Sequence, residues 1–485
     1  MLKTLTLTLV GLAALVSAQL PADDLVSSLE QFDDISFGLY SGYIPIKDTK
    51  KKLHYMAALS KRNPKTDPVI IWFNGGPGCT SMLGFSQENG PYSLSDDDTI
   101  FRVNDYSWNN EATMIYIESP AGVGYSVCGD AKECAFTDDN SADDNMAVVL
   151  SLFETKFPDF QKNDLYIAGE SYAGIYIPQL VKRLDKYITD NAQDPNVFKP
   201  ALKGFMVGNG VTHWQYDAEP AAIEQAYWFG LVDDALYNQM RTCDFTYYDF
   251  DGDTKLNQTC KDLKKKYDSY MNNIQPYDLF GKCYFWPTQK GPQLINGKMV
   301  DLADDASLLQ ERDKYLRVVD YANFKYRDRP DYQQLKDAPS CGTYDGPLLD
   351  YFNKASVKLS LKIDPSITNF KLCSDINYSK NRDGTFAIYQ QLTQPGSKYR
   401  ILKYSGDSDG VVPTQGTMKW IDQLGLKVTK PFRSYDVGGN TAGWVVEYEN
   451  GFTFATIHGA GHMAPQWKGQ QTYHAIFNWI QGQEL

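Results

Sequence analysis

The chain has 485 residues, of which 42% are hydrophobic, 14% aromatic and 22% charged, the composition of a folded globular protein with a sizeable core. Its formal net charge of −13, with no basic run, excludes a nucleic acid as the main partner. Acidity alone does not select a function.

The first 18 residues predict a secretory signal peptide. The segment MLKTLTLTLVGLAALVSA has one early lysine, an apolar stretch too short to span a membrane, and small residues before a cleavage point after Ala18. No later segment has about twenty unbroken apolar residues. We therefore expect a mature protein that follows the secretory route and has no membrane anchor.

Secretory targeting makes the eight cysteines candidates for disulfides. None of them has the CxxC spacing of a metal site, and the sequence alone does not determine their pairing. Sequons at Asn257 and Asn377 predict glycosylation on the same route.

The apolar runs predict an α/β domain with a mostly parallel sheet. FGLYSGYIPI and KLHYMAAL alternate and predict an antiparallel hairpin at the start of the sheet. Runs rich in Ile, Val, Tyr and Phe then end in glycine-rich turns, as in strands buried on both faces. They lie at residues 68–76, 113–122, 165–171, 202–210, 400–409 and 452–462. Amphipathic segments such as 141–157 predict the helices that flank the sheet.

The strand pattern fades between residues 211 and 390. This region is rich in charge, tyrosine and cysteine, and predicts a largely helical cap inserted into a core formed by 19–210 and 391–485. Its DFDGD run, at 249–253, predicts a surface turn rather than a calcium site, because the glycine is misplaced for an EF-hand loop. We expect no metal ion and no cofactor.

The run GESYAG, at 169–174, presents the candidate nucleophile Ser171 after a predicted strand and before a predicted helix. A nucleophile on such a strained turn needs small residues two places before and after it, and Gly169 and Ala173 satisfy this requirement. The string occurs by chance in other proteins, so its position between strand and helix carries the prediction.

A serine nucleophile needs a histidine base and an acidic residue, in the chain order Ser, Asp or Glu, His for an α/β hydrolase. Of the five histidines, His462 best fits a loop after the last strand, whereas His458 belongs to the strand exit. Both Asp407 and Asp409 follow the strand at 400–409, and spacing does not choose between them. The remaining histidines lie in elements of the wrong order, at His54, His213 and His474.

An oxyanion hole requires two backbone N–H donors. The residue after the nucleophile, Tyr172, supplies one, and the glycine-rich run NGGPGCTS, at 74–81, supplies the loop for the other. A phosphate-binding loop is excluded because no Lys-Ser/Thr follows these glycines.

Taken together, SGYI, WFNGGPGCTSMLGF, ENGP, ESPAGVGYS, GESYAGIYIP, KGFMVGNG, YSGDSDGVVP and GAGHMAPQ resemble the serine carboxypeptidases, the family of carboxypeptidase Y, wheat carboxypeptidase II and cathepsin A. The likeness runs in the family's order from about residue 24 to 483. It implies an α/β-hydrolase fold with a cap, and a catalytic triad of Ser171, Asp409 and His462. It also implies oxyanion donors at the Gly76 and Tyr172 amides.

The resemblance further implies a site for the free carboxylate of a peptide's last residue. Its members here are Asn74, Gly75, Glu88 and Glu170, with Trp72 beside them. Two carboxyls and an incoming carboxylate cannot all be ionised at close range, so at least one holds a proton and donates it in a hydrogen bond. Affinity then weakens as pH rises.

The disulfides that the resemblance implies are Cys79–Cys373, Cys243–Cys260, Cys283–Cys341 and Cys128–Cys134. Departures from the family pattern are mild, with Thr80 in place of the usual serine after GGPGC. The insertion is the least similar part, which leaves side-chain preference and oligomer contacts open, a homodimer among them.

The implied function is a carboxypeptidase that removes the last residue of peptides and proteins at acidic pH, in a lysosome-like or vacuole-like compartment or outside the cell. An acyltransferase on the same scaffold is the nearest alternative, although such a protein would be expected to lack the glutamate pair Glu88 and Glu170. A catalytically silent protective or binding subunit is the second alternative, and the intact triad argues against it.

Overall fold

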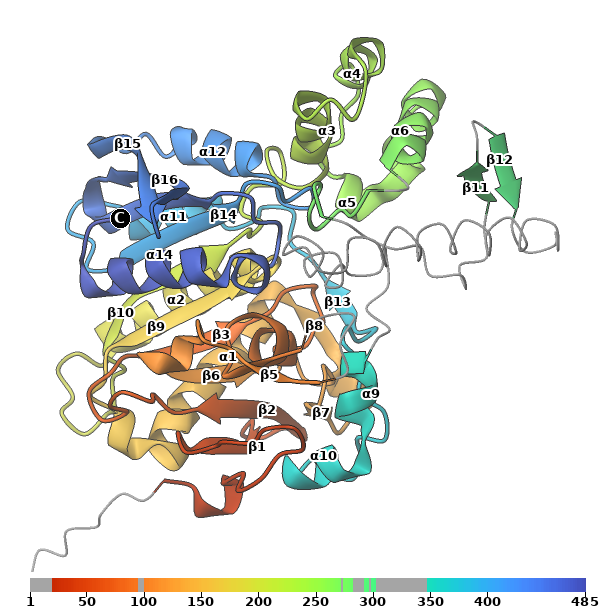
Figure 1. Ribbon diagram of the computed structural model, residues 1–485. Coiled ribbons are helices and arrows are strands. Elements are labelled where there is room, and N and C mark those ends of the chain that lie inside the picture. The colour runs from red at the N-terminus through yellow and green to blue at the C-terminus, as the bar shows by residue number, and fades with distance from the viewer. Residues whose placement is uncertain (1–19, 95–99, 272–273, 282–291, 296–297, 302–346) are drawn as a thin grey trace, which may run out of the picture.

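The computed structural model describes residues 20–94, 100–271, 274–281, 292–295, 298–301 and 347–485 (Figure 1). The predicted signal peptide, residues 1–18, lies outside these ranges, as do Cys283 and Cys341. No helix in the described part of the chain has both the length and the apolar character needed to cross a membrane.

One large mixed sheet forms the centre of the molecule, in the order β1-β2-β6-β3-β9-β10-β14-β17-β16-β15, with β7 beside β2. The central strands β6, β3, β9, β10, β14 and β17 pair in parallel, and antiparallel strands close both edges. This confirms the expected mostly parallel sheet. The strands are β1 Leu39–Pro45, β2 Lys51–Ala58, β3 Val69–Phe73, β6 Thr113–Ile117, β7 Val127–Cys128, β9 Leu165–Glu170, β10 Leu202–Gly208, β14 Arg400–Gly406, β15 Val428–Val437, β16 Asn440–Tyr448 and β17 Phe452–Ile457.

Each of the six predicted apolar runs contains one of these parallel strands, and FGLYSGYIPI pairs with KLHYMAAL as the antiparallel hairpin β1–β2. A second hairpin, β15–β16, was not predicted. Seven of the ten residues of β15 are exposed, so the strand carries no apolar run that would reveal it. Within the described ranges, three small two-stranded pairs lie outside the sheet: β4 Tyr92–Ser93 with β5 Arg102–Val103, β8 Ala135–Thr137 with β13 Asn377–Ser379, and β11 Pro292–Ile295 with β12 Lys298–Asp301.

Helices cover both faces of the sheet. Successive strand residues point to opposite faces, and since both sets are apolar in the central strands, each face needs a layer of helices to bury it. In β3, Ile71 joins the apolar cluster under α1, α2, α11 and α12, whereas Ile70 joins the cluster under α9 and α14. Both clusters are fully buried, as expected of a sheet sandwiched between helices. The flanking helices are α1 Asp138–Ser151, α2 Ala173–Asp190, α9 Pro347–Asn353, α10 Ala355–Ser360, α11 Phe386–Leu392, α12 Thr414–Gln423, α13 Ala464–Trp467 and α14 Gly469–Gln481.

The segment between β10 and β14 carries the cap, whose green helices stand beyond one end of the strands in Figure 1. They are α3 Glu219–Trp228, α4 Asp234–Met240, α5 Tyr248–Asp251 and α6 Gln258–Met271. These helices share a small apolar core of their own. The DFDGD run forms α5 and a following 3-10 turn, Gly252–Lys255, rather than the simple surface turn expected.

Three disulfides join described cysteines: Cys79–Cys373, Cys128–Cys134 and Cys243–Cys260. The first connects the loop after β3 with the segment that returns from the cap to the core. Disulfides of this kind are typical of proteins that pass through an oxidising compartment. Both predicted glycosylation residues, Asn257 and Asn377, are exposed.

Candidate active site

Ser171 lies on the turn between β9 and α2, where its backbone adopts a left-handed φ of 64°. Its N–H donates to the carbonyl of Gly208 at 3.1 Å, which holds the turn against the neighbouring strand. A Cβ atom at Gly169 would lie 2.0 Å from the backbone oxygen of Phe73, so no larger residue fits there. The turn therefore has the strain and the steric demand expected of one that presents a nucleophile.

His462 and Asp409 follow the neighbouring strands β17 and β14 and are bonded to each other. Nδ1 of His462 lies 2.7 Å from Oδ2 of Asp409, and both side chains are almost completely buried. The backbone N–H of Val411 donates to Asp409 at 2.7 Å, and the Asn209 amide donates to it at 2.8 Å. These donors hold the carboxylate in one orientation toward the imidazole ring.

Asp407, the competing candidate, pairs instead with His458. Its Oδ2 lies 2.7 Å from Nδ1 of His458, whose side chain is 55% exposed. Strand residues two places apart point to the same face, but the chain has already left β14 at Asp407, so spacing does not decide their direction. The geometry thus assigns one aspartate to each histidine, and only the Asp409–His462 pair is buried.

The other three histidines lie apart from this pair. His54 is fully buried and bonds Ser41 and Glu118, each at 2.8 Å. His213 packs against Tyr216 and Phe386, and His474 lies in α14.

Nε2 of His462 is buried and makes no hydrogen bond to any residue that the structure describes. It is the ring nitrogen that would receive a proton from Ser171, and such bonds are often long before substrate is bound. The backbone N–H of His462 donates to the carbonyl of Tyr277, whose ring packs 5.2 Å from the imidazole. This loop residue of the cap therefore helps to fix the base.

The glycine-rich loop after β3 lies directly against the nucleophile turn. A Cβ atom at Gly75 would lie 2.3 Å from the backbone nitrogen of Tyr172, so glycine is required for this approach. Gly76 follows with a left-handed φ of 113°. The Cys79 N–H donates to the Gly75 carbonyl at 3.1 Å, and the Cys79–Cys373 disulfide ties the loop to the cap's return segment. The two predicted oxyanion residues, Gly76 and Tyr172, therefore lie beside Ser171.

Asn74 connects the predicted carboxylate-binding residues. Its Oδ1 accepts hydrogen bonds from Nε1 of Trp72 at 2.8 Å and from the backbone N–H of Gly84 at 3.0 Å. Its Nδ2 donates to Glu88 at 2.9 Å and to Glu170 at 3.2 Å. The Trp72 and Gly84 donors fix which end of the amide faces the two glutamates.

The two glutamates form a coupled pair of buried acids. Burial raises the pKa of Glu88, although the bond from Asn74 and the charge of His462 act in the opposite direction. Burial and the charge of Glu88 raise the pKa of Glu170 well above its ordinary value. The two buried carboxyls also hydrogen-bond to each other, which raises the pKa of Glu170 and lowers that of Glu88. The pair is therefore able to keep a proton and to bond an incoming group.

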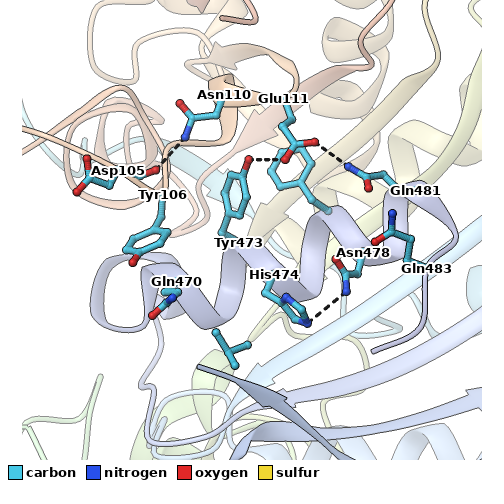
Figure 2. A pocket seen from close by; sticks show the side chains of 12 residues that line it. Asp105, Tyr106, Asn110, Glu111, Gln470, Tyr473, His474, Asn478, Gln481 and Gln483 are labelled. Carbon is cyan, nitrogen blue, oxygen red and sulfur yellow. Dashed lines mark hydrogen bonds between the residues drawn. The ribbon is translucent and has the colours of Figure 1, made fainter. Parts of the chain in front are cut away.

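A cavity of about 320 Å³ opens on the nucleophile. Gly76, Ser171 and Tyr172 form part of its core side, and residues of α3, α5 and α6 form its cap side. A larger surface groove, of about 490 Å³, lies between α14 and the loop at 105–111 (Figure 2). It contains amide and aromatic side chains such as Tyr473 and Asn478, but no member of the proposed triad, so size alone does not locate the chemistry.

Sequence reasoning did not identify Asn209 and Tyr277 as parts of the site. Asn209 adopts a left-handed φ of 38° at the end of β10, and the Gly406 N–H donates to its Oδ1 at 2.9 Å. Its position in GNG, at the carboxyl end of a predicted strand, is the signal that could have identified it. Tyr277 lies in the least regular part of the sequence and carries no such signal.

Comparisons with known proteins agree with this geometry. Residues 30–482 match the family model described as serine carboxypeptidase. The chain is 33% identical over 468 residues to "Serine carboxypeptidase 1" of Hordeum vulgare, covering 92% of this chain and 90% of that protein. It is 30% identical over 493 residues to "Serine carboxypeptidase-like 21" of Arabidopsis thaliana, covering 98% of each.

A solved structure shares the fold. Kex1(delta)p, a prohormone-processing carboxypeptidase from Saccharomyces cerevisiae, superposes with a TM-score of 0.67 at 19% identity, covering 96% of this chain and 97% of that one. The superposition confirms the predicted α/β-hydrolase fold, and the family match spans nearly the whole sequence. The chain therefore belongs to the serine carboxypeptidase family.

Proposed function

We propose that this protein is an acid-active serine carboxypeptidase that removes the last residue from peptides and proteins. The observation that carries the proposal is the buried pair Glu88 and Glu170, bonded to one Asn74 amide directly beside the nucleophile turn. Ser171 by itself indicates only a hydrolase. The glutamate pair, in which Glu170 directly precedes Ser171, supports a binding site for a free carboxylate next to the nucleophile.

In the proposed mechanism, Ser171 attacks the carbonyl carbon of the last peptide bond. His462 takes the serine proton through Nε2 and returns it to the leaving amino acid, while Asp409 holds Nδ1 of His462 and stabilises its positive charge. The amides of Gly76 and Tyr172 receive the developing oxyanion. Water then attacks the acyl-enzyme, with His462 again acting as base.

Recognition of the terminal carboxylate explains the acidic optimum that we propose. A protonated glutamate donates a hydrogen bond to the substrate carboxylate, as do Asn74 and the Gly75 amide. Because both glutamates have raised pKa values, they retain a proton above the pH at which exposed glutamates ionise. Loss of that proton at higher pH places negative charges opposite the substrate and weakens binding.

An acidic compartment of the secretory route, such as a lysosome or vacuole, suits this pH dependence, and the three disulfides support that route. An acyltransferase would use the same triad but would have no need for a terminal carboxylate in its substrate. The retained glutamate pair favours the peptidase.

The test is the release of amino acids from N-blocked dipeptides by the purified protein between about pH 4 and about pH 8. We expect release that is strongest at acidic pH, absent in Ser171→Ala and much reduced when the terminal carboxylate is amidated. Equal release from acid and amide, or activity that survives in Ser171→Ala, would contradict the mechanism. Transfer of the acyl group to an added alcohol without hydrolysis would favour the acyltransferase.

A further inference from the structure

The cavity beside Ser171 has two walls of different character. The residues that the core contributes are uncharged, among them Gly76, Ser171, Val411 and Val412. Among the residues that the structure describes, all the charged side chains of the lining lie on the cap side: Glu219, Asp249, Lys264, Asp268 and Lys380. We call these five residues the cap wall.

The position of the cavity determines which part of a peptide it receives. It contains the nucleophile and both proposed oxyanion residues, but its lining does not include Asn74, Glu88 or Glu170. The terminal carboxylate would therefore lie outside it, on the leaving-group side of the reacting bond. The cavity is left for the penultimate residue, whose carbonyl Ser171 attacks.

Lys264 is already neutralised within the cap wall. Its Nζ lies 3.2 Å from Glu219 and is bonded to Asp268, one turn further along α6. Its Nζ also lies over the ring of Tyr248, 4.8 Å from the centroid, and only 7% of the residue is exposed to solvent. This lysine has little capacity left to attract a substrate carboxylate.

Lys380 is held against aromatic rings. Its Nζ lies 5.7 Å from the ring centroid of Phe250 and 6.0 Å from that of Tyr172, and it reaches the Asp249 carbonyl at 3.5 Å. Its charge lowers the pKa of the Asp249 carboxyl, which burial raises more strongly. Lys380 and Asp249 therefore compensate each other.

Glu219 is only partly neutralised, because it shares Lys264 with Asp268. The cap wall has three carboxylates and two amines, so one negative charge remains when all are ionised. Oε1 of Glu219 is ion-paired with Lys264 at 3.2 Å, but the same ammonium is also bonded to Asp268, so one cation is shared between two carboxylates. Its side chain is 17% exposed and lines the cavity. Burial raises its pKa to about 6, as expected of an acid that lacks full compensation.

We propose that the cap wall, through Glu219, makes lysine or arginine the preferred penultimate residue of the substrate. A long cationic side chain extends past the apolar part of the cavity, near Met271 and Leu279, and places its charge against the Glu219 carboxylate. This inference rests on the proposed carboxypeptidase function and adds its substrate class near neutral pH, where Glu219 is ionised; at clearly acidic pH Glu219 is protonated and the preference should fade.

The experiment compares N-blocked dipeptides that share one C-terminal residue and differ only in the penultimate residue: lysine, norleucine or glutamate. Norleucine keeps the length of lysine without its amine. At about pH 7, above the pKa of Glu219, we expect kcat/KM for the lysine peptide to exceed that for the norleucine peptide by about tenfold. The glutamate peptide should be the poorest substrate.

Glu219→Gln should reduce the ratio of kcat/KM for the lysine peptide to kcat/KM for the norleucine peptide to a value between about 1 and about 3. The matched control is Asp262→Asn, which removes the same charge from an exposed position on α6 outside the cavity and should keep the wild-type ratio. Release from the norleucine peptide shows that each variant is folded.

An unchanged ratio in Glu219→Gln, equal rates for lysine and norleucine, or a preference for glutamate would overturn the inference and leave the carboxypeptidase function intact. No release from any of the three peptides would instead reject the proposed function itself.

Discussion

The carboxylate of Asp409 lies 2.7 Å from Nδ1 of His462, whereas Asp407, two residues earlier, is bonded to His458 at the surface. Two aspartate–histidine pairs of the same chemistry thus lie on adjacent loops. Burial distinguishes them, because only in the absence of water does the carboxylate strongly stabilise an imidazolium.

Asp409→Asn should therefore lower kcat by about 10³-fold to 10⁴-fold, since an amide no longer selects the required tautomer of His462. Asp407→Asn makes the same chemical change at the exposed pair and should alter kcat by less than about twofold. Steady-state kinetics on one N-blocked dipeptide provides both numbers. Similar losses in the two variants would show that the pairing seen in the structure does not identify the catalytic acid.

The pH dependence of substrate affinity should reside in Glu88 and Glu170. Their raised pKa values mean that the shared proton is present at acidic pH and is lost as pH rises, so KM for a peptide acid should increase across that range. The double variant Glu88→Gln, Glu170→Gln carries neutral amide donors at every pH. We expect its KM to become nearly independent of pH. A peptide amide, which lacks the carboxylate, provides the reference, and a KM profile unchanged by the substitutions would refute this role.

The same pair should also affect stability. A carboxyl whose pKa is raised by folding favours the native state fully only below its unfolded pKa, and this contribution is lost as pH rises toward the folded value. The double glutamine variant should consequently lose less stability than the wild type between about pH 4 and about pH 7. Urea unfolding at several pH values measures the difference. Parallel stability curves for the two proteins would contradict the expected linkage.

Asn209 should act as a positioning residue for Asp409. Its amide donates to the Asp409 carboxylate at 2.8 Å, and loss of a hydrogen bond to a charged group costs about 1.5 to 3 kcal/mol. Asn209→Ala should therefore reduce kcat by about tenfold to a hundredfold with little change in KM. Asn209→Asp should not rescue the loss, because it places a second carboxylate beside the first. A change in KM alone would indicate a structural effect on binding instead.

His54 should contribute to stability rather than catalysis. It is fully buried between Ser41 and Glu118, and its removal takes one hydrogen bond from each of these buried partners and leaves a cavity. We expect His54→Ala to destabilise the protein by about 3 kcal/mol, while its folded fraction keeps a normal kcat. His474→Ala, on the half-buried face of α14, should cost less. Chemical unfolding with active-site titration separates the two effects. A fall in kcat per titrated site would assign His54 a catalytic role.

The sequence predicted the parallel strands and the edge hairpin β1–β2 well, because their buried residues form unbroken apolar runs. Ser171 and His462 lie after β9 and β17, as the motifs predicted, and their catalytic roles stay predictions. The outer strand β15 was not predicted, because it is exposed along most of its length and therefore shows no apolar run. Local pattern reveals elements that bury apolar surface, and it reveals little of those that do not.

Contacts between distant segments could not be predicted in the same way. The choice between Asp407 and Asp409 came from the family resemblance, and the bond from Asn209 to Asp409 joins residues 200 positions apart. The charge balance of the cap wall likewise depends on how α3, α5 and α6 meet. The signal peptide, the two glycosylation sites, the domain boundaries, the Cys283–Cys341 bond and a homodimer stay predictions.

The Cys79–Cys373 bond links positions 294 residues apart. The segment that contributes Ser171 precedes the cap, and the segment that contributes Asp409 and His462 follows it. A cut in the chain after Cys260 and before Cys373 would thus yield two polypeptides that the Cys79–Cys373 disulfide still joins covalently. Cys79 belongs to the glycine-rich loop that carries the proposed oxyanion donor Gly76. Continuity of the backbone through the cap is therefore not required to keep the two parts of the proposed triad in one molecule.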